Sequence, residues 1–178
     1  MGRVNYNYKD RYLLTVSARY DGSSRLAPGH KWVLFPSAAL AWRVKEESFL
    51  KDVDCLSNLK LRLGWGITGN TAIDPYKTQG SLEYGRYSYG SNGVLAFYQK
   101  EMPNPNLSWE KTEQWNAGID FGFLNGRIGG SVDLYLQNTN DLLMDRQLPI
   151  VSGFGNVTTN IGQIRNKGLE VTLNTVNI

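Results

Sequence analysis

The most suggestive chemical motif in the 178-residue chain is a glycine-rich run at residues 64–69, GWGITG. It matches the G-x-G-x-x-G fingerprint of dinucleotide-binding loops, and Glu83 lies near the distance at which that fold places a ribose-binding acid. The fingerprint requires a helix that opens at the third glycine, but residues 70–75, NTAIDP, do not begin such a helix. The glycines alternate with apolar residues, as they would along a strand. We therefore predict no nucleotide site here.

The acidic residues, the single histidine and the single cysteine form no recognisable catalytic or metal centre. Three acidic pairs are close in sequence: Glu46/Glu47, Asp52/Asp54 and Glu110/Glu113. A glycosidase needs two carboxyl groups about 5 to 9 Å apart across a cleft. The third pair would instead lie on opposite faces of a strand, and the other two in a turn. His30 lacks the partners of a catalytic triad, and with Cys55 it cannot complete a zinc ligand set. We predict no catalytic residue, no bound metal and no cofactor.

The long connection at residues 70–108 is the one plausible binding feature of the chain. Five aromatic residues within it could contact a ligand: Tyr84, Tyr87, Tyr89, Phe97 and Tyr98. Aromatic faces stack on the apolar C–H surfaces of sugar rings, and a phenol adds a hydrogen bond. The alternative is that these side chains only pack the loop against itself or its neighbours. The spacing of Tyr87 and Tyr89 also predicts a short hairpin within the loop.

Composition and charge exclude several classes of protein. The 19 basic and 16 acidic residues are spread along the chain, so we predict no nucleic-acid partner. No apolar run approaches the roughly 20 residues of a transmembrane helix. The first residues lack an apolar segment, so we expect no signal peptide. The abundance of glycine and aromatic residues (19 Gly, 10 Tyr, 6 Phe and 5 Trp) favours a β-protein.

Apolar and polar residues alternate with a period of two along much of the chain, which predicts an all-β fold of about seven strands. The alternating segments are residues 4–8, 11–21, 33–45, 58–69, 115–123, 128–136 and 169–173. Several exceed the roughly 5 to 6 residues usual in soluble strands and reach the roughly 9 to 11 of a tilted membrane-spanning strand. Aromatic residues near the segment ends predict an interfacial girdle: Tyr12, Tyr20, Trp42, Trp65, Trp109 and Trp115. Alternation alone also permits a soluble sandwich or barrel.

The connections between these segments differ in length on the two sides. Tight turns are predicted at Lys9-Asp10 and at residues 124–126, LNG, where Asn-Gly is a hairpin signal. Three long connections fall on the outer side if the tight turns face the periplasm: residues 22–32, 70–108 and 145–160. The remaining connection, residues 46–57, is longer than this asymmetry predicts, and we expect one helical turn in it at residues 48–51.

Beyond these patterns, specific stretches of sequence occur in a fixed order. The longest is residues 11–25, RYLLTVSARYDGSSR. The others are KW at 31–32, FPS at 35–37, AWRV at 41–44, LKLR at 59–62, GITGN at 66–70, NPNLSWEKT at 104–112, QWN at 114–116, DFGFL at 120–124, DLL at 141–143 and NKGLE at 166–170. Together they resemble the SusC/RagA family of TonB-dependent outer-membrane transporters over nearly the whole chain. These are barrel motifs and not catalytic ones.

The resemblance implies a role in importing large nutrients, such as oligosaccharides or peptides, across the outer membrane of Bacteroidetes-type bacteria. Members of the family are barrels with an internal plug, work with a SusD-like surface lipoprotein and draw energy from the TonB complex. Transporters of this type have about 22 strands, of which seven are about a third. Alone, seven strands would leave two unpaired edges in lipid. We therefore expect residues 1–178 to be a fragment from the C-terminal half of a larger barrel domain, with the plug and signal peptide absent from it.

The leading hypothesis is an antiparallel up-and-down transmembrane β-barrel segment in the cell outer membrane that is not an enzyme. Its apolar stripes would face outer-membrane lipid, and its polar faces would line a lumen with Arg62, Gln114, Asn116, Asp120 and Asp133. The outer loops would contact the ligand and the lipoprotein, whereas the TonB complex would act through regions outside this chain. The alternative is a soluble carbohydrate-binding β-domain that uses exposed tyrosines.

Overall fold

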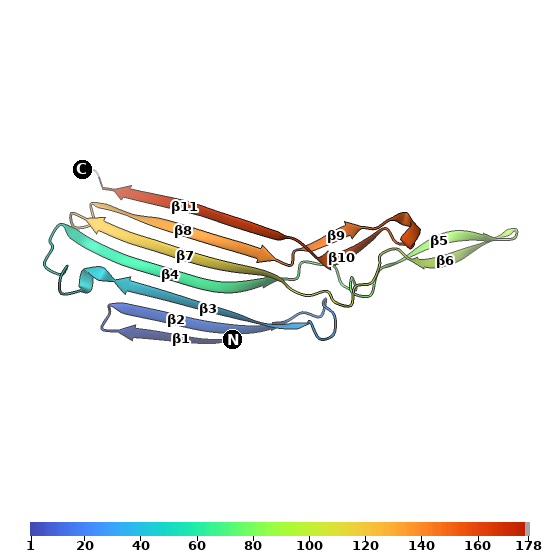
Figure 1. The fold of residues 1–178 in the computed structure, drawn as a ribbon, viewed down its shortest axis with the longest axis horizontal. Helices are drawn as coiled ribbons and strands as arrows, with labels where there is room; N and C mark the ends of the chain where they lie inside the picture. The colour runs from blue at the N-terminus through green and yellow to red at the C-terminus, as the bar shows by residue number, and fades with distance from the viewer. Residues whose placement is uncertain (177–178) are drawn as a thin grey trace.

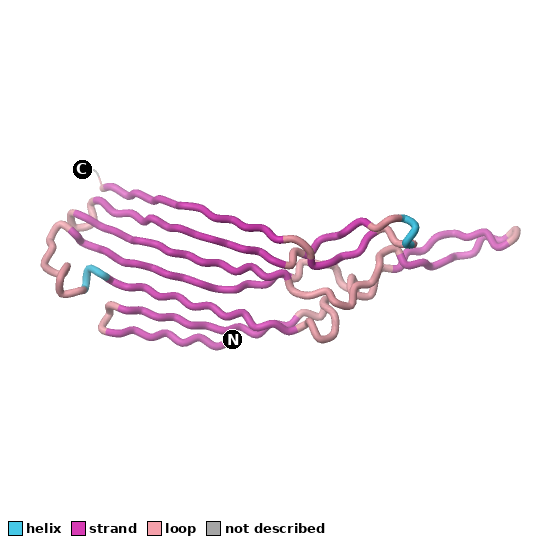
Figure 2. Tube along the Cα trace, viewed as in Figure 1, coloured by secondary structure: helices cyan, strands magenta, loops and turns pink. Residues whose placement is uncertain are grey.

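The computed structural model describes residues 1–176, which are built almost wholly of β-strands (Figures 1 and 2). The strands are β1 (Gly2–Tyr8), β2 (Tyr12–Gly22), β3 (Trp32–Arg43), β4 (Leu56–Asn70), β5 (Leu82–Tyr89), β6 (Asn92–Gln99), β7 (Glu110–Phe123), β8 (Ile128–Asn140), β9 (Leu143–Gln147), β10 (Asn156–Asn160) and β11 (Gln163–Thr175). Two short 3₁₀ helices are η1 (Val44–Glu46) and η2 (Ile150–Ser152). Among residues 1–176, no helix has the length and apolar character needed to cross a membrane.

Seven of the strands form one antiparallel sheet in the order β1-β2-β3-β4-β7-β8-β11. Apart from the separate pairs β5–β6 and β9–β10, strands that lie next to one another in the sheet also follow one another along the chain, so the topology is up-and-down. The strands reach 15 residues in β4 and 14 in β7, well above the usual length in soluble sheets. The predicted all-β, antiparallel fold is confirmed. Within the described residues the sheet is open, with β1 and β11 at its edges (Figure 1).

One end of the main sheet, which we call the turn end, contains the predicted tight turns. Lys9 and Asp10 join β1 to β2 with φ angles of 52° and 53°. Leu124 and Asn125 join β7 to β8 with φ angles of 53° and 56°. The whole connections are residues 9–11 and 124–127, and two successive positive φ angles in each give a turn whose twist suits the paired strands. Both tight turns therefore form where the sequence predicts them.

The third connection at the turn end joins β3 to β4 and contains η1. The 3₁₀ helix η1 precedes the predicted residues 48–51. A hydrogen-bonded turn also forms at the predicted position, because the N–H groups of Leu50 and Lys51 both donate to the carbonyl oxygen of Glu47 at 3.0 Å. The side chain of Lys45 ties this connection together, because its Nζ donates to the carbonyl oxygens of Leu50, Lys51 and Val53 at 3.0, 3.2 and 2.7 Å. These hydrogen bonds draw the rest of the connection around η1.

The opposite end, which we call the loop end, carries the three long connections. Two of these contain separate two-stranded sheets, β5–β6 and β9–β10 (Figure 1). The β5–β6 hairpin confirms the one predicted from Tyr87 and Tyr89. The sequence does not predict the β9–β10 hairpin, which lies largely within the long connection expected at residues 145–160. Its strands are only five residues long, which is too short for alternation to stand out.

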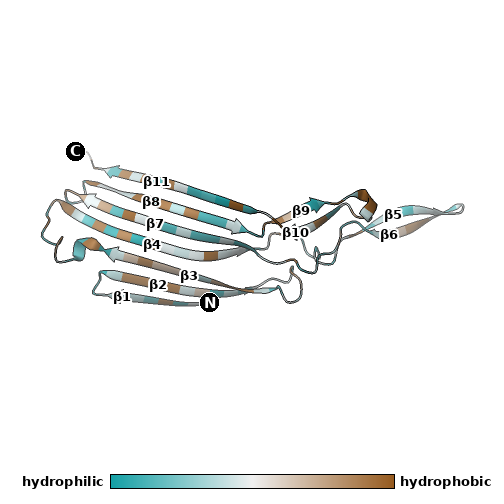
Figure 3. Cartoon of the chain, in the orientation of Figure 1, coloured by the Kyte–Doolittle hydropathy of each residue, from teal (hydrophilic) through white to brown (hydrophobic). Residues whose placement is uncertain are grey.

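The main sheet has one apolar and one polar face, seen as alternating bands along each strand in Figure 3. Residues paired across neighbouring strands share a face. One such row runs from β2 to β11 and consists of Leu14, Leu40, Leu63, Ala117, Leu134 and Leu169. The five leucines of this row are all exposed. Among residues 1–176, no second layer covers the apolar face (Figure 1).

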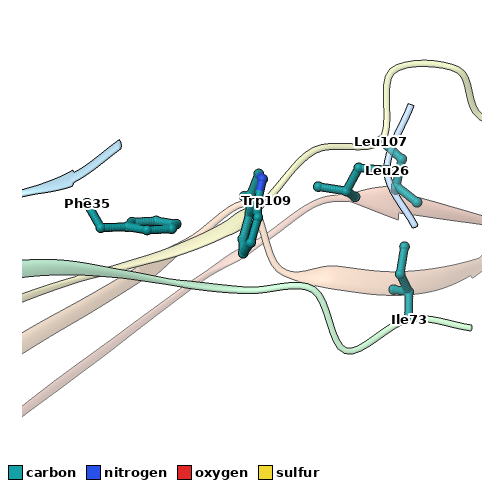
Figure 4. Close-up of a cluster of buried hydrophobic side chains, with 5 residues drawn as sticks. All are labelled: Leu26, Phe35, Ile73, Leu107 and Trp109. Atoms are coloured by element: carbon teal, nitrogen blue, oxygen red, sulfur yellow. The ribbon is translucent and has the colours of Figure 1, made fainter. Parts of the chain in front are cut away.

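A cluster of buried hydrophobic side chains lies at the loop end (Figure 4). We call this cluster the collar, and it consists of Leu26, Phe35, Ile73, Leu107 and Trp109. The rings of Phe35 and Trp109 meet edge to face with centroids 5.3 Å apart, and Trp109 Nε1 donates to the carbonyl oxygen of Lys31 at 3.0 Å. The prediction that Trp109 belongs to a membrane girdle is wrong, because these contacts bury its side chain. The collar joins the long connections to one another.

Candidate functional site

An ion-pair network joins three neighbouring strands on the polar face. Arg62 on β4 donates from Nε and Nη2 to the two carboxylate oxygens of Asp120 on β7, at 2.9 and 2.7 Å. The same Nη2 lies 2.9 and 3.1 Å from the carboxylate oxygens of Asp133 on β8. Lys60 adds a longer contact of 4.0 Å to Asp120. Forked pairing of guanidinium and carboxylate combines charge with fixed geometry, so the network holds β4, β7 and β8 in register.

Gly118 leaves the space that this network occupies. It is paired with Arg62 on one side and with Asp133 on the other. A Cβ atom at this position would lie 2.9 Å from Arg62 Nη2 and closer still to Asp133 Oδ1. A side chain here would therefore push the charged groups apart.

The two remaining residues predicted to line a lumen, Gln114 and Asn116, lie on the same face. Gln114 Nε2 donates to Asn116 Oδ1 at 3.3 Å. A hollow of about 270 Å³ beside them is lined by Arg62, Asn116, Asp133 and residues of β2 and β3. The structure thus brings Arg62, Gln114, Asn116, Asp120 and Asp133 onto one face, where charges and amides can meet a polar solute. That this face lines a lumen stays a prediction.

Aromatic residues form a rim on the apolar face at the turn end. Tyr12 and Trp42 stack with ring centroids 6.0 Å apart. Both donate to Glu47 Oε1, from the phenol at 2.7 Å and from the indole at 3.1 Å. The hydrogen bond from Tyr12, followed by that from Trp42, lowers the pKa of Glu47. Arg11 completes the cluster with a contact of 3.1 Å to the second carboxylate oxygen.

A matching rim lies at the loop end of the apolar face. The rings of Trp65 and Trp115 are 5.9 Å apart, and both indoles donate to Glu113 Oε1, at 2.8 and 3.1 Å. Tyr20 on β2 and Trp32 on β3 also stack at the loop end, with ring centroids 5.3 Å apart. Amphipathic rings at both ends of an apolar band are typical of membrane-spanning strands. The sequence did not predict that Glu47 and Glu113 accept hydrogen bonds from the two rims, although Glu113 shares the alternating face of Trp115.

The G-x-G-x-x-G run has a packing role in this structure. A Cβ on Gly69 would lie 2.6 Å from a carbon of the Phe35 ring and 2.8 Å from a carbon of the Trp109 ring. A Cβ on Gly66 would lie 3.1 Å from the Cβ of Ser37. These glycines therefore allow β4 to approach the collar and strand β3 closely.

The structure does not bring the five predicted ligand-binding aromatic residues together. In the β5–β6 register, Tyr84 is paired with Phe97 and Glu83 with Tyr98. Tyr84 and Phe97 therefore lie on one face of the hairpin, and Tyr87, Tyr89 and Tyr98 lie on the other. The signal for this register is the two-residue Gly90-Ser91 turn, in which Gly90 has a φ of 65°.

Tyr87, Tyr89 and Tyr98 make up what we call the tyrosine face. Tyr98 donates its hydroxyl to Glu83 Oε2 at 3.1 Å, and Lys100 Nζ donates to Glu83 Oε1 at 3.1 Å. These hydrogen bonds, with that from Lys100 the larger, lower the pKa of Glu83, and the neighbouring carboxylate raises the pKa of Tyr98. The face combines ring surfaces for stacking with polar groups in fixed positions.

Comparison with known proteins places these features in a family. The family profile described as "TonB dependent receptor-like, beta-barrel" matches residues 1–176. The chain is 48% identical to TonB-dependent receptor SusC of Bacteroides thetaiotaomicron, over 97% of this chain and 18% of SusC. It is 40% identical to TonB-dependent receptor P26 of Formosa agariphila, over 99% of this chain and 18% of P26. A solved structure of the RagAB peptide transporter matches with a TM-score of 0.84 and 32% identity, over 96% of this chain and 19% of that one.

These matches confirm the resemblance that the sequence motifs indicate. The chain spans less than a fifth of the length of SusC, P26 and the RagAB chain. The related proteins are receptors and transporters, in agreement with the prediction that the chain is not an enzyme. The chain belongs to the TonB-dependent receptor β-barrel family, whose members are β-barrels of the outer membrane.

Proposed function

We propose that the receptor containing this chain imports oligosaccharides or peptides across the outer membrane, with residues 1–176 as part of its barrel wall. The observation that carries this proposal is the apolar face, on which large exposed apolar residues lie side by side across all seven strands. Monomeric proteins in water rarely expose continuous apolar patches above a few hundred Å². Against lipid the face needs no cover, and further strands would pair with the edges of β1 and β11.

The polar face would then line a water-filled interior. Barrels of this kind have strands whose residues alternate between lipid and lumen, and their interiors are polar. Arg62, Asp120 and Asp133 would present fixed charges to a passing solute, while Gln114 and Asn116 would present amides. The same ion pairs keep the wall in register. The soluble carbohydrate-binding alternative is not favoured, because it leaves the apolar face in water.

The proposed partners lie at the two ends of the wall. A SusD-like surface lipoprotein would sit over the loop end, and the TonB complex would supply energy from the turn end through parts of the receptor outside this chain. The similarity to SusC and to the RagAB peptide transporter supports both partners. The tyrosine face would contact the ligand, since phenol rings stack on sugar rings and on the side chains of peptides.

Uptake by intact cells tests this proposal. The full-length receptor gene is deleted and restored, and uptake of fluorescent oligosaccharide and peptide mixtures is measured with and without a functional TonB complex. We expect uptake of one class to require both the receptor and TonB. Unchanged uptake of both classes after deletion of the receptor would contradict the proposal.

A further inference from the structure

The β5–β6 hairpin extends beyond the rest of the loop end as a separate two-stranded sheet (Figure 1). Within the described residues, no third strand pairs with either of its edges. A two-stranded hairpin is only marginally stable by itself in water and gains stability from a surface to pack against. The hairpin therefore has the form of an arm that is completed by contact with something else.

One face of the arm is apolar and differs in chemistry from the tyrosine face. We call it the docking face and define it by Leu82, Tyr84, Arg86, Leu95 and Phe97, which share this face with Ser88, Gly93 and Gln99. Its four apolar side chains are 69, 70, 59 and 68% exposed for Leu82, Tyr84, Leu95 and Phe97. Leu82 and Leu95 offer neither a hydrogen bond nor an aromatic ring, so they contribute nothing specific to sugar binding. Apolar side chains grouped around an arginine are instead typical of protein–protein contacts.

The base of the arm is fastened to the loop end. Lys77 Nζ and Glu101 Oε1, which flank the hairpin, form an ion pair of 2.6 Å. The backbone N–H of Lys100 donates to the carbonyl oxygen of Ser81 at 2.9 Å, and the N–H of Gly155 donates to the carbonyl oxygen of Lys100 at 3.3 Å. The arm is thus held where it points away from the main sheet (Figure 1).

Position and charge narrow down what covers the docking face. The arm lies beyond the loop ends of β4 and β7 (Figure 1), and the rim residues Trp65 and Trp115 lie within these two strands. The band expected to contact lipid therefore ends before the arm, and lipid is not its occupant. Arg86 makes no ion pair within residues 1–176. A partner that suits this face therefore presents an apolar patch with an acidic group beside it.

We infer that the docking face binds the surface lipoprotein of the proposed function, leaving the tyrosine face free for the ligand. This inference rests on the proposed transporter function and adds to it the surface through which the lipoprotein is held. Arg86 pairs with a carboxylate of the lipoprotein, and Leu82, Leu95 and Phe97 fill an apolar patch on it. The two faces of one hairpin thus divide partner binding from ligand binding.

Two neighbouring substitutions test this division. Leu95→Asp places a charge on the docking face, and Val94→Asp places the same charge on the opposite face of the same strand. Both are made in the full-length receptor, which is purified in detergent, and its affinity for the SusD-like lipoprotein encoded beside it is measured. We expect Leu95→Asp to weaken the affinity by about 10-fold or more, as loss of a central interface residue does. Val94→Asp should leave the affinity for the lipoprotein within about threefold of that of the unmodified receptor, because substitutions outside an interface change binding little.

The possible results separate this inference from the proposed function. Equal affinity of the Leu95→Asp and unmodified receptors would overturn the docking face, even if the unmodified receptor binds the lipoprotein and imports its ligand. Equal weakening by both substitutions would also overturn it, since the arm would then act through its own folding. A Leu95→Asp receptor with normal lipoprotein affinity but faster proteolysis of residues 82–99 would show that another loop of the receptor covers the face. An unmodified receptor that neither binds the lipoprotein nor imports a ligand would instead remove the proposed function.

Discussion

Gly118 shows how one missing side chain organises the polar face. Its position between Arg62 and Asp133 lets the guanidinium reach carboxylates on two different strands. Without that reach, Asp120 and Asp133 would face each other as like charges without the cation between them. The effect of Gly118 therefore comes from the space it leaves.

We predict that Gly118→Ala lowers the stability of the full-length receptor by about 1–3 kcal/mol, because the added Cβ displaces the Arg62 ion pairs. Urea unfolding of the receptor refolded into lipid vesicles measures this change. Gly64→Ala is the matched control on the same face, since its Cβ would lie 3.8 Å from Asn116 Cβ, an ordinary contact. Equal unfolding midpoints for the two variants would contradict the prediction.

The face of the sheet on which a residue lies was easier to predict than the residues that it contacts. Alternation along each strand placed Arg62, Asp120 and Asp133 on polar faces, but it could not show that they meet, because that depends on the register of three strands. The prediction that Trp109 belongs to a membrane girdle was wrong for the same reason, because its contacts depend on the tertiary structure. An aromatic residue next to a strand end fits a membrane rim. Trp109 is instead buried by contacts with Phe35 and Lys31, which lie far from it in the sequence.

At the scale of elements, the collar makes the three long connections act as one unit. Asn104 Nδ2 donates to the carbonyl oxygen of Thr158 at 2.9 Å, and Asn160 Nδ2 donates to that of Ser108 at 2.9 Å. These hydrogen bonds fasten the segment before β7 to β10. Leu107, which is fully buried, lies between Asn104 and Ser108 in the sequence. The NPNLSW part of the sequence motif at residues 104–112 is thus explained by loop packing.

We expect Leu107→Ala to loosen the loop end while the main sheet stays folded. Truncation of a buried leucine costs about 2–5 kcal/mol, and here the cost falls on the collar. Hydrogen exchange of the full-length receptor should show faster exchange at residues 70–108 and unchanged exchange in β4 and β7. Leu169→Ala, at an exposed position of the apolar face, serves as the control. Unchanged loop exchange in Leu107→Ala would mean that the collar does not hold the connections.

Long elements could be predicted from the sequence and short ones could not. Strands of 11 to 15 residues, such as β2 and β4, repeat the period of two often enough to be distinguished from a helix. The five-residue strands β9 and β10 do not. Alternation along β5 already separates Tyr84 from Tyr87 and Tyr89, whereas the faces of Phe97 and Tyr98 relative to them depend on the register across the Gly90-Ser91 turn.

For the whole molecule, the exposed leucines distinguish a membrane wall from a soluble sheet. Leu63 is 57% exposed in the middle of the apolar row. In water, arginine at so exposed a position would change stability by about 0.5 kcal/mol or less. Facing lipid near the middle of the bilayer, it costs about 2–4 kcal/mol. We therefore predict that Leu63→Arg strongly reduces the amount of assembled receptor in the outer membrane.

Gln114→Arg is the matched control, because it places the same side chain on the exposed polar face. Assembly is measured by the heat-dependent mobility of the full-length receptor on denaturing gels. Arg62 is unsuitable as a control, since its replacement also breaks the ion pairs to Asp120 and Asp133. Equal amounts of assembled Leu63→Arg and Gln114→Arg receptor would contradict the lipid-facing assignment of the apolar face.

The sequence by itself determined the all-β class, the seven long strands and the tight turns at one end, because these follow from residue types at short, fixed spacings. It also indicated the family, through the resemblance of ordered sequence motifs along the chain. Tertiary structure alone decided which residues meet: Arg62 with two aspartates, two tryptophans with Glu113, and loop residues in a buried collar. It also showed that five aromatic residues of one loop lie on two faces. The physical reason is that alternation is local to a strand, whereas register and loop packing join residues tens of positions apart.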